Sequence, residues 1–106
     1  MKLSEYQNRI ENFWISNDRD EIRVLLGICG ESGEIAELFK KYFRDDKITY
    51  DEMKRLASKE IGDLSYYIAK LCNDLDLNWE NILQENIDKL KDRQNRNVIK
   101  GSGDER

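Results

Sequence analysis

The sequence contains no histidine, and this absence excludes a large part of protein chemistry. Without histidine there is no Ser-His or Cys-His nucleophile pair and no HExxH zinc helix. The Glu-x-x-His pairs of ferritin-like di-iron bundles are excluded as well. The two cysteines, Cys29 and Cys72, lack the spacing of a CxxC or zinc motif, so we interpret them as small buried apolar residues. Carboxylates, lysines, arginines and a hard cation remain as the means of catalysis.

Long apolar runs and an excess of positive charge are also missing. No apolar stretch reaches the ~18 residues that a membrane-spanning helix needs, and the first residues do not resemble a signal peptide. The net charge of −4 argues against a general nucleic-acid binder. We therefore expect a cytoplasmic protein that binds neither nucleic acid nor a membrane.

What the sequence does contain is helical periodicity, uninterrupted by proline. Charged residues make up 38% and apolar residues 39%, which is typical of helices with salt-bridged outer faces. Capping patterns at Ser4, Thr49 and Asn78 indicate where helices begin. The periodicity predicts four helices, at about residues 4–15, 21–44, 50–75 and 79–95. We expect an all-α fold, a small four-helix bundle.

The predicted domain comprises residues 1–96, and residues 97–106 form an irregular C-terminal tail without periodicity. A helical chain of this size buries only about two-thirds of its unfolded surface. Association would cover part of the rest, and the second predicted helix carries apolar residues beyond a single stripe. We therefore expect a homo-oligomer.

Two quartets of the form acid-x-Gly-acid lie within apolar helical runs, at residues 31–34 and 60–63. At about 100° per residue, Glu31 and Glu60 point in the same direction as their apolar neighbours. Glu34 and Asp63 lie at matching edges of these two arcs. Burial of an ionised carboxylate costs several kcal/mol unless a partner compensates it. The alternative interpretation is a set of ordinary solvated helical acids.

Antiparallel packing of the second and third predicted helices would bring the two quartets face to face. A site with only oxygen ligands selects Mg²⁺, or Mn²⁺ as a second possibility. We therefore predict Glu31, Glu34, Glu60 and Asp63 as metal ligands. Between the acids lie Gly33 and Gly62, which serve either close helix packing or space beside the metal.

A ridge of hydrogen-bond donors on the fourth predicted helix consists of Asn86, Lys89 and Arg93. If these donors face the metal, they suit the oxygens of a polyphosphate substrate. An ordinary surface ridge is the alternative. The tail from Lys100 to Arg106 contains two glycines that can fold around a phosphate, or it is simply a flexible end. Four aromatic residues are candidates to stack on a nucleobase, with a place in the core as the alternative: Trp14, Trp79, Tyr66 and Tyr67.

Taken together, these motifs resemble the MazG-like, all-α nucleoside triphosphate pyrophosphohydrolases, in particular the small single-domain type found in phages and prophages. The resemblance covers nearly the whole chain. It rests on the following segments: Glu5-Tyr6-Gln7, Gly30 to Ala36, Lys59 to Leu64, Asn86 to Leu90 with Arg93, and Gly101 to Asp104. Many members of this family have a glutamate directly before the first motif acid, where this chain has Gly30.

The resemblance implies Mg²⁺-dependent cleavage of an NTP or dNTP to a nucleoside monophosphate and pyrophosphate. It implies that Glu31, Glu34, Glu60 and Asp63 hold the metal. Because the chain has no histidine, any general base is a carboxylate or a metal-bound hydroxide, and Glu34 is our candidate if one of the four acids has this second role. The predicted substrate-binding residues are Asn86, Lys89, Arg93, Lys100 and Gln7. Members of the family assemble as dimers or tetramers, with sites near subunit contacts.

Two other functions are compatible with the same residues. One is a helical module without catalytic activity, which senses a nucleotide or binds another protein. The other is a hydrolase that acts on a different pyrophosphate-containing small molecule. The sequence leaves open which nucleobase and which sugar the substrate carries. It also leaves open the number of metal ions and the identity of the general base.

Overall fold

The computed structural model describes residues 1–106, and every regular element in it is helical. The elements in chain order are α1 (Leu3–Ile10), the short 3₁₀ helix η1 (Glu11–Phe13), α2 (Asp20–Phe43), α3 (Tyr50–Asp74) and α4 (Trp79–Asn95). The predicted all-α fold class is thus confirmed, and the limits of the last three helices lie within one or two residues of the prediction.

Two of the three predicted helix caps are present. The Thr49 hydroxyl accepts a hydrogen bond from the Glu52 amide at 3.1 Å, and the Asn78 side chain accepts one from the Asn81 amide at 3.0 Å. The cap predicted at Ser4 is wrong, because α1 begins at Leu3 and no side chain caps it. The first helix is also shorter than predicted: it tightens into η1 and ends before Trp14, whose backbone is extended.

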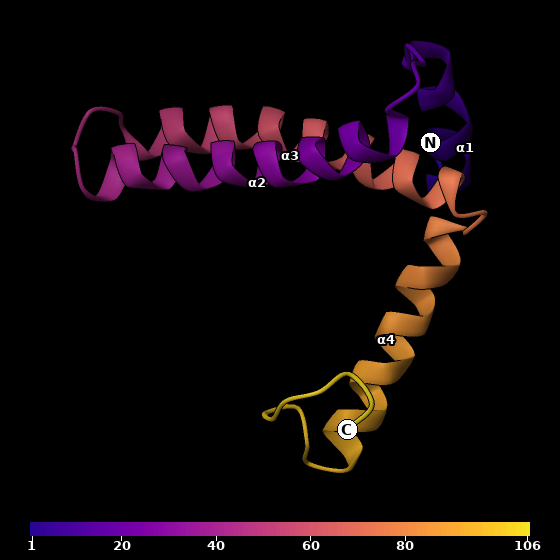
Figure 1. Ribbon diagram of the computed structural model, residues 1–106. Coiled ribbons are helices and arrows are strands. Elements are labelled where there is room, and N and C mark those ends of the chain that lie inside the picture. The colour runs from indigo at the N-terminus through magenta and orange to yellow at the C-terminus, as the bar shows by residue number, and fades with distance from the viewer.

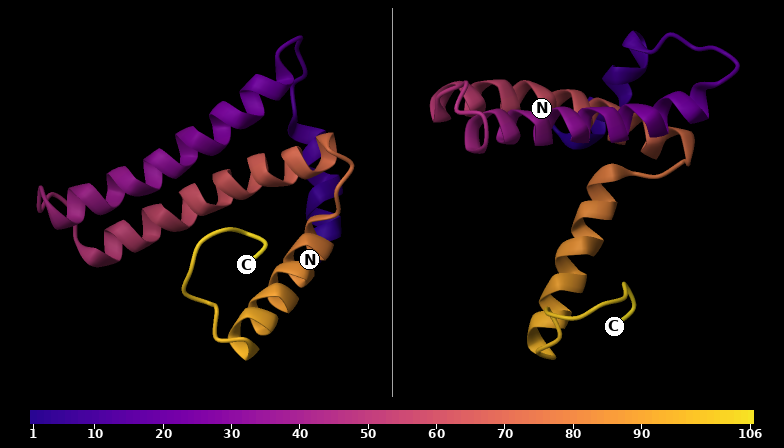
Figure 2. Two further views of the ribbon diagram at one scale, coloured as in Figure 1. Left: turned by 60° about the horizontal axis from the view of Figure 1, so that its bottom comes forward. Right: turned by 60° about the vertical axis from the view of Figure 1, so that its left-hand side comes forward.

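The two long helices α2 and α3 form an antiparallel hairpin (Figure 1). Near the closed end of the hairpin, a small apolar core consists of Leu38, Met53 and Ala57. At the open end, α1 lies against α3 (Figure 2). The axial alignment of α2 on α3 decides which side chains of the two helices meet.

A buried ion pair attaches η1 to α3. Lys70, only 7% exposed, lies 2.9 Å from the Glu11 carboxylate and 3.1 Å from the Asp74 carboxylate. Burial alone would lower the pKa of Lys70, but hydrogen bonds with both acids outweigh it and raise this pKa. The Lys70 ammonium and the Arg23 guanidinium also lie over the Trp14 ring, at 5.1 and 4.6 Å from its centre. Trp14 is therefore held by packing within the fold.

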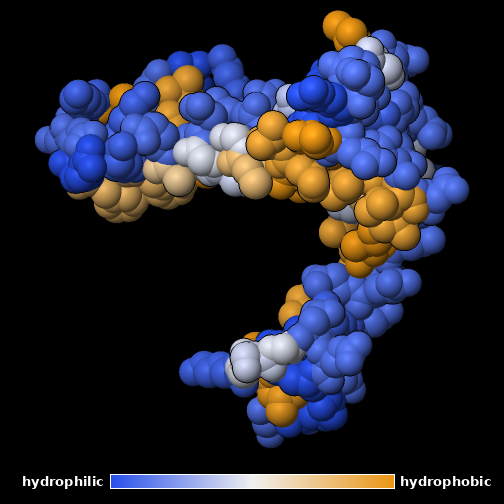
Figure 3. Space-filling view, viewed as in Figure 1, coloured by the Kyte–Doolittle hydropathy of each residue, from blue (hydrophilic) through white to orange (hydrophobic).

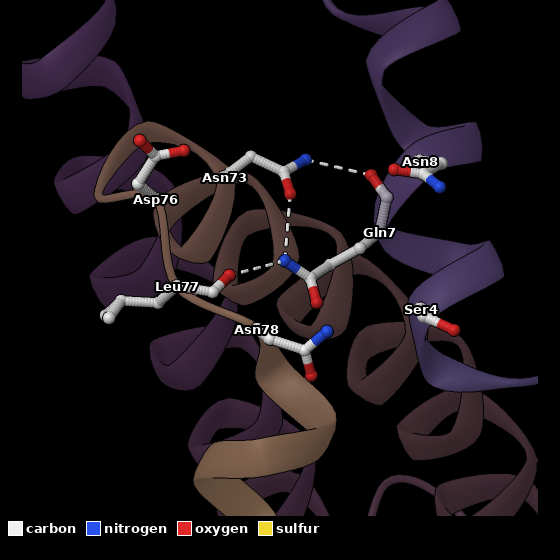
Figure 4. Close-up of a pocket in the computed structure, with 7 residues that line it drawn as sticks. All are labelled: Ser4, Gln7, Asn8, Asn73, Asp76, Leu77 and Asn78. Atoms are coloured by element: carbon white, nitrogen blue, oxygen red, sulfur yellow. Dashed lines mark hydrogen bonds between the residues drawn. The ribbon is translucent and has the colours of Figure 1, made fainter.

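Gln7 joins α1 to the elbow between α3 and α4, shown in Figure 4. Its side-chain nitrogen donates to the Asn73 side chain at 2.9 Å and to the Leu77 carbonyl at 2.8 Å. Its side-chain oxygen accepts from the Trp79 amide at 2.7 Å. The buried amide group of Gln7 is thus fully used by three segments of the chain itself.

Beyond this elbow, α4 points away from the hairpin (Figure 1). Within the chain α4 packs mainly on α1, so one chain does not close four helices around a single core. The radius of gyration is 16.9 Å, whereas a compact domain of this length has about 13 Å. Only 10 of the 106 residues are buried, which leaves a large apolar surface exposed. None of the helices has both the length and the apolar composition required to span a membrane.

Candidate functional site

Three carboxylates from α2 and α3 meet in the middle of the hairpin. Glu31 on α2 and Glu60 and Asp63 on α3 each place a carboxylate oxygen within 4.8 Å of the other two. The ion pairs of the chain all join other residues, so no lysine or arginine neutralises this cluster. Three carboxylate oxygens this close together form a donor set that fits a small divalent cation such as Mg²⁺.

The fourth predicted ligand, Glu34, is exposed and lies outside this cluster. Three residues beyond Glu31, it sits at the edge of the arc that faces α3, as its angle on the helix predicts. The structure therefore brings together three of the four predicted acids. A Cβ atom added at Gly33 or Gly62 would have no neighbour within 4 Å, so close helix packing within the chain does not explain these glycines.

The crowding of negative charge changes the protonation of Glu31. A hydrogen bond shared with Glu60, together with burial and the charge of Asp63, raises the pKa of Glu31 to about 7. Without a cation, the cluster thus holds a proton between Glu31 and Glu60 near neutral pH. A divalent cation would displace that proton when it binds.

This shared proton predicts a pH dependence of stability. Because the pKa of Glu31 is raised on folding, the folded state binds more protons than the unfolded state between about pH 4.5 and pH 7. We expect the melting temperature of the metal-free protein to lose this contribution as the pH rises through about 7. The increase in melting temperature caused by Mg²⁺ should conversely be larger at about pH 8 than at about pH 6. Circular dichroism melts in EDTA and in MgCl₂ measure both, and equal Mg²⁺ effects at the two pH values would contradict the assignment.

An aromatic groove of about 430 Å³ lies directly beside the cluster. Its lining residues are Tyr6, Ile10, Phe13, Gly62, Asp63 and Tyr66. Burial and the nearby charge of Asp63 raise the pKa of Tyr6. Tyr66 was among the aromatic residues predicted from the sequence, whereas Tyr6 and Phe13 were not. Only the folding of α1 and η1 across α3 brings them to Asp63.

The predicted donor ridge on α4 binds the C-terminal tail. The Lys89 ammonium lies 2.7 Å from an Asp104 carboxylate oxygen, and the Arg93 guanidinium lies 3.3 Å from the same oxygen. These two cations hold the pKa of Asp104 below its usual range. Arg93 is buried, and its Nε atom has no hydrogen-bond partner. Asn86 and Lys100 are exposed.

Within the single chain this ridge does not face the acid cluster, because α4 points away from the hairpin (Figure 1). The elbow after α3 contains Asp76 in the left-handed backbone conformation, with φ of 58°, and turns α4 away from the hairpin. Gln7 also lies apart from the cluster, since its partner Asn73 is ten residues, or about 15 Å, beyond Asp63 along α3.

The tail has no regular secondary structure but is folded by its last residue. The Arg106 guanidinium donates to the carbonyls of Val98, Ile99 and Gly103 at 3.0, 2.9 and 2.6 Å. Gly103 has a φ of 86°, which favours glycine at that position. This hook places Asp104 against Lys89 and Arg93.

Comparison with known proteins shows that the chain is similar to a phage protein. The chain is 43% identical over 84 residues to the Gene 37 protein of Mycobacterium phage L5, and the alignment covers 78% of this chain and 74% of that protein. No family model and no solved structure matches the chain.

Proposed function

The chain belongs to the family of the Gene 37 protein of Mycobacterium phage L5, and we propose that it is a Mg²⁺-dependent nucleoside triphosphate pyrophosphohydrolase. In this proposal it cleaves an NTP or dNTP to the nucleoside monophosphate and pyrophosphate, in the cytoplasm. The reaction in this proposal is inferred from the resemblance of the sequence to the MazG-like enzymes.

The observation that carries the proposal is the uncompensated cluster of Glu31, Glu60 and Asp63. Three carboxylates from two helices converge without a cation from the chain, two of them half-buried and Asp63 exposed. Such an arrangement destabilises the fold unless a ligand offsets the repulsion. Mn²⁺ fits the same oxygen ligands as Mg²⁺.

The residues around the cluster have distinct roles in the proposed reaction. Mg²⁺ bound there would polarise the phosphoryl oxygens and make a water more acidic. Glu34, which lies outside the cluster on the same face of α2, would accept the proton of the attacking water. The aromatic groove lined by Tyr6, Phe13 and Tyr66 offers faces on which a nucleobase can stack. Lys89, Arg93 and Lys100 would bind the phosphates, which requires Lys89 and Arg93 to release Asp104.

The proposal includes assembly as a homodimer or homotetramer. The exposed apolar surface supports it, because sixteen large apolar side chains are more than about a third exposed in the single chain. A monomeric domain does not normally leave so much of its apolar surface in water.

A pyrophosphate-release assay tests the proposal. The purified protein, given a panel of NTPs and dNTPs, should release pyrophosphate only when Mg²⁺ or Mn²⁺ is present, and EDTA should abolish the release. A non-catalytic module would bind nucleotide or metal without turnover. Binding alone, at 100 times the dissociation constant, would still stabilise the fold by about 2.7 kcal/mol. The absence of pyrophosphate release from every nucleotide in the panel would contradict the proposed activity.

A further inference from the structure

Two of the cations that the proposed function assigns to the phosphates are occupied by an acid of the tail, residues 97–106. The Lys89 ammonium lies 2.7 Å from a carboxylate oxygen of Asp104. The Nη2 atom of Arg93 donates both to this oxygen and to the backbone carbonyl of Asp104. Two oxygens of one tail residue thus stand where two phosphate oxygens would bind.

The tail also covers Arg93. The Arg93 side chain keeps only 7% of its surface accessible, whereas the Asp104 side chain keeps 79%. Arg93 lies fourteen residues, or about 21 Å, beyond the start of α4 at Trp79, far from the elbow where α1 packs on this helix. At this end of α4 only the tail lies alongside the helix (Figures 1 and 2). A phosphate can therefore reach Arg93 only after the tail has moved.

The contact with the tail leaves the Arg93 guanidinium incompletely paired. Its Nε atom is buried and has no hydrogen-bond partner, because both contacts with Asp104 come from Nη2. A phosphate binds a guanidinium through two parallel hydrogen bonds from neighbouring donors, such as Nε and Nη2. A phosphate in place of Asp104 would therefore satisfy a donor that the tail leaves unpaired.

The fold of the tail depends on no contact with the hairpin. The Arg106 side chain binds three carbonyls of the tail itself, and Arg96 at the end of α4 donates to the Arg106 carbonyl at 2.8 Å. Figure 3 shows the end of α4 with the tail as a mainly hydrophilic lobe, separate from the apolar side of the hairpin. Movement of the tail would therefore leave the apolar core near the closed end of the hairpin intact.

We propose that the tail is an autoinhibitory latch, in which Asp104 occupies the phosphate-binding cations of α4 until a polyphosphate displaces it. An anion then binds only the fraction of molecules in which the latch is open, and its apparent affinity is reduced by that fraction. As a statement about the regulation of the proposed site, this inference rests on the proposed function for its substrate. Its geometry is that of α4 and the tail.

Titration of the whole chain with inorganic tripolyphosphate in EDTA, followed by ¹H–¹⁵N NMR spectra, tests the latch. Asp104→Asn removes the competing charge and should bind tripolyphosphate about 5-fold more tightly than the wild type. Pyrophosphate should gain by the same factor, because opening of the latch costs every anion the same.

Glu105→Gln is the matched control for this substitution. It removes the same charge from the next residue, which is exposed and forms no ion pair, and it should bind tripolyphosphate as the wild type does. Equal affinities of the Asp104→Asn and Glu105→Gln proteins, or no binding to any of the three proteins, would overturn the proposal.

A second variant opens the latch without changing Asp104. Arg106→Gln removes the three hydrogen bonds that fold the tail. Loss of a positive charge by itself weakens the binding of an anion, whereas an open latch strengthens it. Tighter binding of tripolyphosphate to Arg106→Gln than to the wild type is therefore the expected result, and weaker or equal binding would contradict the latch.

The movement of the tail is measured in the same samples. Order parameters of the backbone amides of residues 98–104 should resemble those of α4 in the free wild type and fall when tripolyphosphate binds. A tail that stays as rigid in the bound state as in the free state would overturn the displacement. If no NTP or dNTP yields pyrophosphate, the proposed function fails, while this titration still decides the latch.

Discussion

Substitution of Glu60 by Gln is expected to reduce pyrophosphate release on the order of 100-fold or more while making the metal-free protein more stable. The loss follows because Glu60 supplies one of only three clustered oxygens for the cation. The gain follows because the same substitution removes one of the three carboxylates that are crowded together in the cluster. An increase of roughly 4 °C in melting temperature corresponds to a relief of about 1 kcal/mol for a domain of this size.

The two effects are measured together, by pyrophosphate release in MgCl₂ and by circular dichroism melts in EDTA at equal protein concentration. Glu85→Gln is the matched control, because Glu85 is an exposed acid that forms no ion pair in the chain. It should change neither quantity. A Glu60→Gln protein that melts below the wild type in EDTA would show that the cluster stabilises the fold by itself and needs no cation.

The helices and the phase of the acids on them could be predicted from the sequence because both depend on local periodicity. Glu31 and Glu60 lie in the middle of apolar stripes, so antiparallel packing of those stripes places both in the contact between the helices, where the axial alignment of α2 on α3 brings them together. Glu34 and Asp63 lie at matching edges of their stripes, yet only Asp63 joins the cluster, so the position of an acid on its own helix does not decide whether it enters. That decision depends on the rotation of α2 against α3, which periodicity alone does not determine.

The direction of α4 could not be predicted for a different reason. It depends on a short elbow, on the left-handed backbone at Asp76, and on the hydrogen bonds of Gln7 to both sides of the elbow. From the resemblance, Gln7 was predicted to bind substrate, and nothing in the sequence indicates its partners in the elbow. Moreover, an apolar stripe has the same sequence pattern whether it packs on its own chain or on a partner chain. The stripe of α4 therefore does not indicate the direction of this helix.

The close contact between Gly27 and Tyr67 could not be predicted from the sequence either. Gly27 precedes Glu31 by one helical turn on α2, and Tyr67 follows Asp63 by one turn on α3. A Cβ atom at residue 27 would overlap the Tyr67 ring. That ring cannot move freely, because it packs against Trp14 and Tyr66 with ring centres 6.3 and 5.2 Å away. The two helices can therefore approach this closely beside the site only with glycine at residue 27.

Gly27→Ala is accordingly expected to damage the site without changing any acid. Overpacking should lower the free energy of unfolding by about 1–3 kcal/mol. It should also separate Glu31 from Glu60 and Asp63, and so lower the apparent affinity for Mg²⁺ at least about 10-fold.

Gly30→Ala is the matched control on the same helix, since a Cβ there meets nothing within 4 Å. It should raise the free energy of unfolding by about 0.5–1 kcal/mol, as alanine does in an exposed helix. Denaturant unfolding with and without Mg²⁺ measures both variants. If Gly27→Ala responded to Mg²⁺ as Gly30→Ala does, the spacing of α2 and α3 at Tyr67 would not control the cluster.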